Sequence, residues 1–358
     1  MCQEKCPVKI NTGELIKTLR QEALEKAAEG EAKPRGAAVA AFLASHFGTV
    51  SALVPPFLNI VSVVHSVIGS RPMNWIAGTV WGVGNNMVPL WNQYMPRGAQ
   101  PLALPTSNAD ADADRRKVVY LASCVTRMMG PARGDTDAGE EAVHAKLISV
   151  LEKAGYDVVV PEGIGSMCCG MIFDSRGFRD VGASQASDLQ QQLLQVSEGG
   201  KLPIICDTSP CLQRMKEKFD DPLLKFALYE PVQFISMYLK DRLQFQKVRD
   251  TVAIHVPCSS KKLKLNDQMV ELAEMCAREV HVTPIPCCGM AGDRGMRYPE
   301  LTEASLQHLE LPTTCSDGYS TSRTCEMSLS NHSDVHFRSL LYLIDEAAQP
   351  KVKGDAAN

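Results

Sequence analysis

The chain has 358 residues, enough for two or three domains, and 45% of them are hydrophobic while 22% are charged. These proportions are ordinary for a soluble globular protein. The formal net charge of −4 gives no overall basic field of the kind that draws a protein onto nucleic acid or anionic lipid. Nucleic acid is therefore not expected as a partner.

Thirteen cysteines are too few for a disulfide-dense miniature scaffold and too many for chance burial in a chain of this size. The N-terminal residues do not form a charged and then apolar leader with a small-residue cleavage site. We therefore predict a cytoplasmic protein, because a reducing compartment keeps thiolates available to metals. A peripheral position on the inner face of the cytoplasmic membrane is left open.

The first predicted element is a helix over residues 12–30. Leu15, Ile16 and Leu19 recur at the spacing of one helix face, and Gly30 ends the pattern. We expect this helix to pack against the rest of the protein.

Residues 37–68 are apolar and carry few charges, a composition that also suits a membrane span. Pro55, Pro56 and several polar residues interrupt the run, so a pair of short helices is the favoured interpretation. Residues 75–91 are predicted to be irregular because Gly and Pro are frequent, and to join the core rather than contact a membrane or partner domain. The Asn/Ala/Asp run over residues 106–114 has the composition of a linker.

From residue 117 onward the pattern alternates between strand and helix, which predicts parallel strands joined by helical crossovers. The predicted strands are 118–121, 156–160, 203–205, 251–256 and 280–285, and the predicted helices are 141–153, 183–196, 232–240 and 267–279. The same landmarks recur in the same order, as in a repeated module. The predicted fold class is α/β, with two tandem cysteine-rich domains of parallel sheets flanked by helices after a mostly helical N-terminal region.

Each copy carries four cysteines at expected strand ends: one after the opening strand, a Cys-Cys-Gly tripeptide after the second, and one after the third. The first set is Cys124, Cys168, Cys169 and Cys211, and the second is Cys258, Cys287, Cys288 and Cys325. Loops at the carboxyl edge of a parallel sheet converge, so thiols distant in sequence can meet there. Four thiolates suit a [4Fe–4S] cluster or, as the alternative, a tetrahedral zinc ion. The glycine permits the bend that lets adjacent cysteines face one site.

Ordinary core burial is the competing interpretation of these cysteines, but it explains neither the repetition nor the placement at strand ends. Cys276 lies in an apolar helical stretch and is assigned to the core. Cys206 and Cys315 are candidates for auxiliary ligands.

Cys2, Cys6 and Pro7 match the end of the bacterial ferredoxin run C-x2-C-x2-C-x3-C-P. The first two cysteines of that run are absent here, so Cys2 and Cys6 are metal candidates only together with ligands from elsewhere. The alternative is a chance match. The motif predicts that the chain is a piece of a longer polypeptide.

These motifs resemble the C-terminal part of the bacterial FAD- and iron–sulfur-containing D-lactate dehydrogenases. The segments that carry the resemblance are residues 255–262 (HVPCSSKK), 287–295 (CCGMAGDRG), 318–326 (GYSTSRTCE) and 6–13 (CPVKINTG). More distantly, the repeats are similar to the cysteine-rich subunits of heterodisulfide reductases and of anaerobic glycerol-3-phosphate dehydrogenase. The C-x2-C that ends each repeat in the reductase pattern is missing here, which puts a five-ligand cluster of that type in doubt.

The resemblance implies the electron-transfer portion of a flavoprotein, in which FAD on a missing domain or partner subunit oxidises D-lactate or another 2-hydroxy acid. The cysteine-rich portion would relay the electrons to a quinone or cytochrome. The implied organisation is a ferredoxin remnant and helix at 1–30, a connecting region at 31–115, and Cys-Cys-Gly domains at 116–245 and 246–350. A structural zinc scaffold that docks a flavoprotein, and a thiol/disulfide redox catalyst, remain alternatives.

Other polar residues near the motifs have simpler interpretations. His255 is favoured as a satisfied core or edge residue rather than a ligand. Arg294 and Arg323 are either surface residues or cations that stabilise a reduced cluster, and Asp293 is expected to cap a helix or pair with an arginine. The sequence contains no complete G-x-G-x-x-G, Walker or G-x-S-x-G motif and names no catalytic residue.

Overall fold

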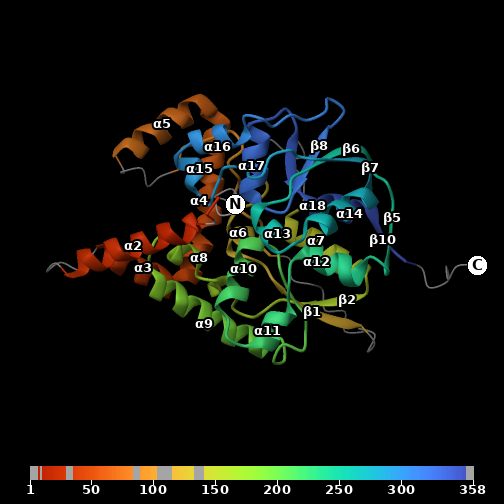
Figure 1. Ribbon diagram of the computed structural model, residues 1–358, viewed down its shortest axis with the longest axis horizontal. Coiled ribbons are helices and arrows are strands. Elements are labelled where there is room, and N and C mark those ends of the chain that lie inside the picture. Colours follow the sequence, from red (N-terminus) through yellow and green to blue (C-terminus); the bar gives the residue numbers. More distant parts are fainter. Residues whose placement is uncertain are drawn as a thin grey trace, which may run out of the picture.

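The structure, a computed structural model, describes residues 7–8, 10–29, 35–83, 89–102, 115–132 and 141–351. A group of N-terminal helices precedes two α/β units (Figure 1). The N-terminal helices are α2 (Thr12–Glu29), α3 (Arg35–Ser45), α4 (Phe47–Ile68) and α5 (Ser70–Val83).

Each α/β unit alternates strands with helices. The first comprises β1 (Arg116–Leu121), α6 (Cys124–Met128), α7 (Val143–Lys153), β2 (Tyr156–Val159), η1 (Ile164–Ser166), α8 (Met171–Asp174), α9 (Arg179–Val196), β3 (Ile204–Cys206), α10 (Ser209–Lys218), α11 (Pro222–Ala227), β4 (Leu228–Tyr229), α12 (Pro231–Phe234), the π-helical turn η2 (Ile235–Leu239) and β5 (Leu243–Phe245). The second comprises β6 (Arg249–Ile254), α13 (Cys258–Lys262), α14 (Asn266–Cys276), β7 (Ala277–Val282), α15 (Arg294–Arg297), α16 (Glu300–Leu306), β8 (Asp317–Ser320), α17 (Arg323–Asn331), β9 (His336–Ser339), α18 (Leu340–Ala347) and β10 (Ala348–Pro350).

The two units share one sheet topology. The strand order is β2-β1-β3-β4 in the first sheet and β7-β6-β8-β9 in the second, and every pairing within these sheets is parallel. Helices cover the sheets, so the central strands are buried and apolar throughout their later residues. The predicted α/β fold class, with two parallel sheets and a helical N-terminal region, is confirmed.

One apolar core joins the two units. It takes Leu147 of α7 and Val118 of β1 from the first unit, and Leu272 of α14 and Leu343 of α18 from the second, all fully buried. The short antiparallel pair of β5 and β10 also links the units. The units are therefore held in one fixed arrangement, with α7, α14 and α18 packed between the sheets.

Several predicted boundaries need correction. The second helix of the N-terminal pair is not short, because α4 continues for 22 residues through Pro55 and Pro56. Gly98 packs directly on the Pro55 carbonyl and donates its N–H to Asn59 Oδ1 at 3.0 Å, so tertiary contacts support the helix there. The region predicted to be irregular begins with the helix α5. The expected helix over 267–279 ends at Cys276, because the following residues pair with β6 as β7.

Helix α4 is long and apolar enough to cross a membrane by length and composition, with a mean hydropathy of 1.7 and 17% of its apolar window buried. Its exposed face presents large apolar side chains at helical spacing: Leu53, Phe57, Ile60, Val64 and Val67. On α5, Trp75 is 73% exposed. The two helices thus present apolar surface that the described part of the chain does not cover.

A buried carboxylate fastens the first unit to the second. Asp345 of α18 accepts from Ser149 Oγ at 2.6 Å and pairs with Lys153 at 2.7 Å and Lys146 at 3.1 Å, all three on α7. Burial opposes ionisation, but these donors hold the pKa of Asp345 below its ordinary value. Its stabilising effect is therefore present above about pH 4 and is lost as the pH falls through the lowered pKa.

We expect Asp345→Ala to lower the free energy of unfolding by about 3 kcal/mol, since it leaves two lysines without their buried partner. Glu346→Ala is the control, because the neighbouring Glu346 pairs with Arg249 at the exposed surface and should cost below about 1 kcal/mol. Urea denaturation at neutral pH measures both, and equal losses would contradict this role of Asp345.

Candidate metal centres

Short helices present the outer cysteines of each set. Cys124 and Cys258 are the first residues of α6 and α13, whereas the sequence placed them at strand ends. Ser123 ends the strand segment early because its Oγ accepts from the Thr126 N–H at 3.2 Å as an N-cap. Cys211 and Cys325 each occupy the third position of a longer helix, α10 and α17. Helix N-termini stabilise thiolates, and both units place their outer cysteines in the first turn of a helix.

The first four-cysteine cluster is Cys124, Cys168, Cys169 and Cys211. The Cys124 thiol interacts with the thiols of Cys168 and Cys211, which lowers its pKa despite burial. Cys169 interacts with the same two thiols, and its pKa is lowered as well. The pKa values of Cys168 and Cys211 move upward because these thiols act as donors to their neighbours. The four thiols of this cluster therefore face one another.

The second four-cysteine cluster is Cys258, Cys287, Cys288 and Cys325. The Sγ atoms of Cys288 and Cys325 lie 3.1 Å apart, and the Cys287 thiol interacts with those of Cys258 and Cys288. These contacts lower the pKa of Cys287 and Cys325 and raise that of Cys258 and Cys288. The structure therefore brings together all eight cysteines that the sequence predicted, in two sets of four.

His255 lies beside the second cluster. Its ring is fully buried, Nδ1 lies 2.8 Å from Thr283 Oγ1, and Nε2 makes no hydrogen bond of ordinary geometry within the described residues. The ring helps to lower the pKa of Cys325, after the larger effect of Cys288. The sequence favoured a satisfied core histidine, whereas the structure places it against a candidate ligand.

The Cys-Cys-Gly turn has the same geometry in both units. Gly170 has φ +74° and Gly289 has φ +78°, values at which an L side chain is strained. In each turn the glycine N–H points at the Sγ of the first cysteine, at 3.3 Å for Cys168 and 3.4 Å for Cys287. A Cβ on Gly170 would lie 2.1 Å from the Gly182 carbonyl oxygen of α9. The turn can therefore exist only with glycine at this position.

Matching side chains hold the backbone next to each Cys-Cys pair. Arg127, three residues after Cys124, donates to the Met167 carbonyl at 2.6 Å, and Lys261, three residues after Cys258, reaches the Pro286 carbonyl at 3.4 Å. Residues three apart lie on one helix face, so these cations are placed by the same helices as the outer cysteines.

The carbonyl of the second cysteine in each pair is held in an equivalent way. Arg214 Nε donates to the Cys169 carbonyl at 2.7 Å, and Ser328 Oγ donates to the Cys288 carbonyl at 2.7 Å. Each donor again follows an outer cysteine by three residues. We did not predict these four supports from the sequence, although this spacing could have signalled them.

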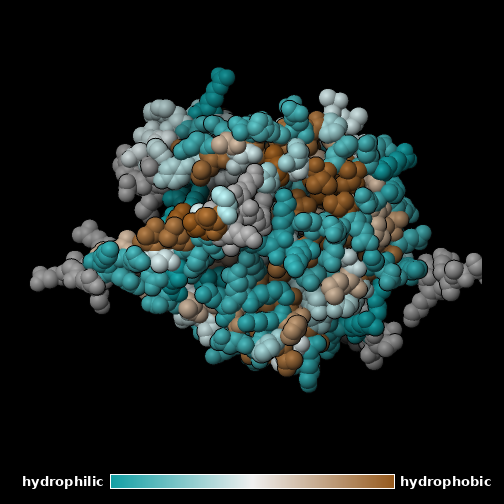
Figure 2. All heavy atoms as spheres, viewed as in Figure 1, coloured by the Kyte–Doolittle hydropathy of each residue, from teal (hydrophilic) through white to brown (hydrophobic). Residues whose placement is uncertain are grey.

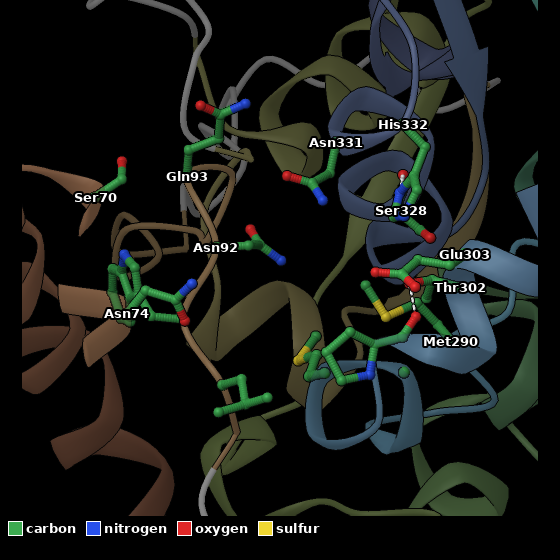
Figure 3. A pocket seen from close by; sticks show the side chains of 15 residues that line it. Ser70, Asn74, Asn92, Gln93, Met290, Thr302, Glu303, Ser328, Asn331 and His332 are labelled. Carbon is green, nitrogen blue, oxygen red and sulfur yellow. Dashed lines mark hydrogen bonds between the residues drawn. The ribbon is translucent and has the colours of Figure 1, made fainter. Parts of the chain in front are cut away.

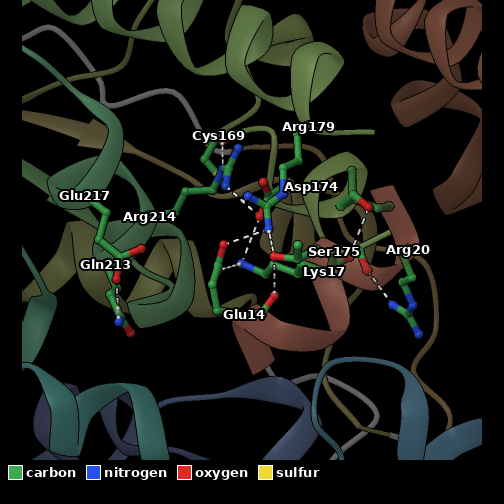
Figure 4. A network of polar contacts seen from close by, with 12 residues as sticks. Glu14, Lys17, Arg20, Cys169, Asp174, Ser175, Arg179, Gln213, Arg214 and Glu217 are labelled. Atoms are coloured by element: carbon green, nitrogen blue, oxygen red, sulfur yellow. Dashed lines mark hydrogen bonds and ion pairs between the residues drawn. The ribbon is translucent and has the colours of Figure 1, made fainter. Parts of the chain in front are cut away.

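Arg214 also connects the first cluster to the N-terminal helix (Figure 4). Its Nη1 lies 3.0 Å from Asp174 Oδ2, which pairs with Lys17 of α2 at 2.8 Å. Arg179 binds Glu14 on the same helix at 2.7 Å. The predicted packing helix therefore docks on the first unit through polar contacts. Hydrophobic side chains gather over α2 at the surface in Figure 2, including the half-exposed Leu15 and Leu19.

The remaining cysteines lie in different surroundings. Cys206 is buried and lines a small cavity of about 20 Å³ with the first cluster, whereas Cys276 belongs to the shared core, as predicted. Cys315 packs in the apolar cluster that contains Cys288 and Cys325. Cys2 and Cys6 lie outside the described residues.

The charged residues near the second motif are engaged with one another. Asp293 pairs with Arg176 at 2.5 Å and with Arg297 at 3.3 Å, which confirms the expected pairing with arginine. Arg323 pairs with the buried Glu326, so it does not lie free at the surface. Arg294 lies near Arg20, whose pKa is lowered by burial and then by neighbouring arginines.

A pocket of about 440 Å³ opens near the second cluster (Figure 3). Its lining includes Met290, two residues after Cys288, and Ser328, which donates to the Cys288 carbonyl. The remaining wall is mixed, with the polar side chains of Ser70, Asn74, Asn92, Gln93, Thr302, Glu303, Asn331 and His332 and the apolar side chains of Leu90, Trp91, Met296 and Pro299. A small polar molecule could therefore come within two residues of the second cluster.

The donor chemistry of both clusters fits an iron–sulfur centre. Each offers four thiols, two of them with a lowered pKa, and a backbone N–H directed at a sulfur, as in cysteine-ligated clusters. Within the described ranges, no group of three or more His, Cys, Asp or Glu side chains is placed so that it could hold a metal ion. The thiols interact with one another instead. The 3.1 Å contact between the Cys288 and Cys325 sulfurs is shorter than the roughly 3.8 Å between sulfurs around tetrahedral zinc, and shorter still than the separation of cysteine sulfurs around an iron–sulfur cluster. Ligation by these cysteines stays a prediction.

Comparison with protein families matches residues 118–216 to the cysteine-rich domain abbreviated CCG. Such domains are typical of iron–sulfur redox proteins. A comparison with curated proteins found no match for the chain. The matched segment holds the whole first cluster, so the assignment of the second unit to the same family rests on its shared topology and is a proposal.

We expect Gly170→Ala to lower the free energy of unfolding by about 3 kcal/mol or more, because the methyl group combines positive-φ strain with a clash against α9. Gly163→Ala is the matched control: Gly163 has φ +66° but open space around its Cβ position, so it should cost only about 1 kcal/mol. Thermal unfolding of both variants tests this, and equal losses would show that the close approach to α9 is unimportant.

Proposed function

We propose that the chain is the iron–sulfur electron-transfer portion of a flavin-dependent dehydrogenase of D-lactate or another 2-hydroxy acid. The observation that carries the proposal is the repeated four-cysteine geometry, one copy of which lies in a CCG domain. The motif resemblance suggests a 2-hydroxy acid as the substrate, and FAD would be carried by another domain or by a partner subunit. The second unit is proposed to be a CCG domain as well.

A [4Fe–4S] cluster held at each site would supply one-electron transfer. The chain's own residues do the rest: four cysteines hold each site, the glycine N–H groups bind sulfur, and Arg127 and Arg214 place positive charge beside the first set. These features stabilise the added negative charge of a reduced state. Two cysteines of each set are buried and two are partly exposed, so each site is largely but not fully shielded from water.

The proposed partners find support in surface features. The exposed apolar strip of α2, docked against the first cluster, suits contact with the FAD-bearing partner. The 440 Å³ pocket at the second cluster would admit a small acceptor such as a quinone, and α5 with its exposed Trp75 forms part of its wall. A cytochrome remains the other proposed acceptor.

Anaerobic purification should yield a brown protein with iron and acid-labile sulfide that dithionite bleaches. Cys211→Ala and Cys325→Ala should each lose about half of the iron, because each removes a ligand from one of two clusters. Cys276→Ala is the control and should retain the iron, since Cys276 lies in the shared core. A colourless protein with stoichiometric zinc and no dithionite response would favour the zinc scaffold and contradict the proposal.

Peripheral binding to the inner face of the cytoplasmic membrane is part of the proposal, through the exposed apolar face of α4 and α5. Vesicles of neutral phospholipid should co-float the protein, and Val64→Glu with Val67→Glu should abolish flotation by placing charge on that face. Leu223→Glu is the control, because Leu223 is 66% exposed on α11 of the first unit. Flotation unchanged by the α4 substitutions would contradict this surface.

A further inference from the structure

A buried carboxyl group lies where the two units meet and takes no part in holding either cysteine cluster. Glu230 is 1% exposed at the start of α12, and its Oε2 accepts from the Val232 N–H at 2.6 Å. Burial, followed by the repulsion of Asp207, raises the pKa of Glu230 to about 7, against the backbone donors and Thr321 that favour its charged form. Its charge therefore changes near neutral pH.

A chain of hydroxyl groups connects this carboxyl to the helices that carry the cysteines. Thr321, which interacts with Glu230, lies 3.3 Å from Ser260, and Ser260 lies 3.4 Å from Ser209. The Ser209 and Ser259 hydroxyls are 2.6 Å apart. Ser209 lies on α10 two residues before Cys211, and Ser259 lies on α13 directly after Cys258, so these hydroxyl groups belong to helices that carry one cysteine of each cluster.

Few other charges act on Glu230. The charge of Asp207, which follows β3, raises the pKa of Glu230. Tyr120 of β1 donates to Asp207 at 2.6 Å, and Arg127 of α6 and His144 of α7 feel the same carboxylate.

The other elements that pack near Glu230 present no free charge to it within the described part of the chain. On α14, Glu271 pairs with Lys240 at the surface, while Asp267 and Glu274 are exposed. On the β8–α17 side, Thr321 makes the contact, and Arg323 and Glu326 pair with each other.

We propose that Glu230 is a redox-linked proton site that takes up one proton when an electron enters the neighbouring cysteine clusters. This inference rests on the proposed electron-transfer function. The electron comes from the reduced flavin of the partner, and the proton comes from solvent and converts the Glu230 carboxylate to the carboxylic acid. On reoxidation the electron and the proton both leave, so charge balances in each direction. The added negative charge of reduction is what raises the proton affinity of the buried carboxylate.

The test is an equilibrium redox titration of the iron-loaded protein from about pH 6 to about pH 8.5. The midpoint potential of the wild type should fall as pH rises, by up to about 59 mV per pH unit. For a one-electron couple, this is the potential that corresponds to a tenfold change in proton concentration. Glu230→Gln keeps the size and the oxygen acceptor but cannot ionise, so its potential should be independent of pH. Glu271→Gln, a surface change on α14, should keep the wild-type slope.

Thr321→Val provides a second variant should Glu230→Gln fail to fold. It keeps the carboxyl but removes a donor to its charged form, so the pH-dependent region should move to higher pH. Infrared difference spectra, reduced minus oxidised, should also show a protonated carboxyl band that Glu230→Gln lacks. A loaded wild-type protein with a pH-independent potential, or a Glu230→Gln variant with the wild-type slope, would overturn this inference alone. A protein that binds no iron would overturn the proposed function itself.

Discussion

The positive-φ glycine of the Cys-Cys-Gly turn is the constraint on which both sites depend. Two adjacent cysteines on extended chain point to opposite sides, so they can share a site only where the backbone turns sharply. At Gly170 and Gly289 the turn also directs the glycine N–H at the sulfur of the first cysteine. The backbone of a neighbouring helix lies so close to each glycine that a Cβ atom would not fit. The outer cysteines are placed separately, by the N-terminal turns of α6, α10, α13 and α17.

The two units repeat this plan but differ in charge. At the first site the supporting donors are Arg127 and Arg214, and the latter is buried. At the second site the equivalent donors are Lys261 and the neutral Ser328, with His255 against the outer cysteine. Arg214 is also paired with Asp174, so its charge is partly balanced. In the proposed function, the remaining difference in charge would stabilise the reduced state of the first site more than that of the second.

Much of the fold could be predicted because fully buried parallel strands leave apolar runs in the sequence. The repeated cysteines, which the structure gathers into two sets, were visible as a spaced pattern. The long helix through Pro55 and Pro56 was not predictable, because the contact from Gly98 that supports it comes from a distant segment. The boundary between Cys276 and Ala277 was also missed, since strand pairing with β6 overrides a local helical pattern.

The role proposed for Glu230 could not be predicted from the sequence for a related reason. Only the tertiary structure shows that Glu230 is buried, and it is burial that raises the pKa of its carboxyl group. Glu230 is buried because α12 contributes Val232 and Phe234 to the core that the two units share. In the same region the hydroxyl groups of Ser209, Ser259 and Ser260 face one another. In a medium of low dielectric constant, a charge added on one side of this interface is felt on the other. The packing that joins the units therefore buries the ionisable Glu230 next to Thr321 of the second unit, where the proposed proton uptake would take place.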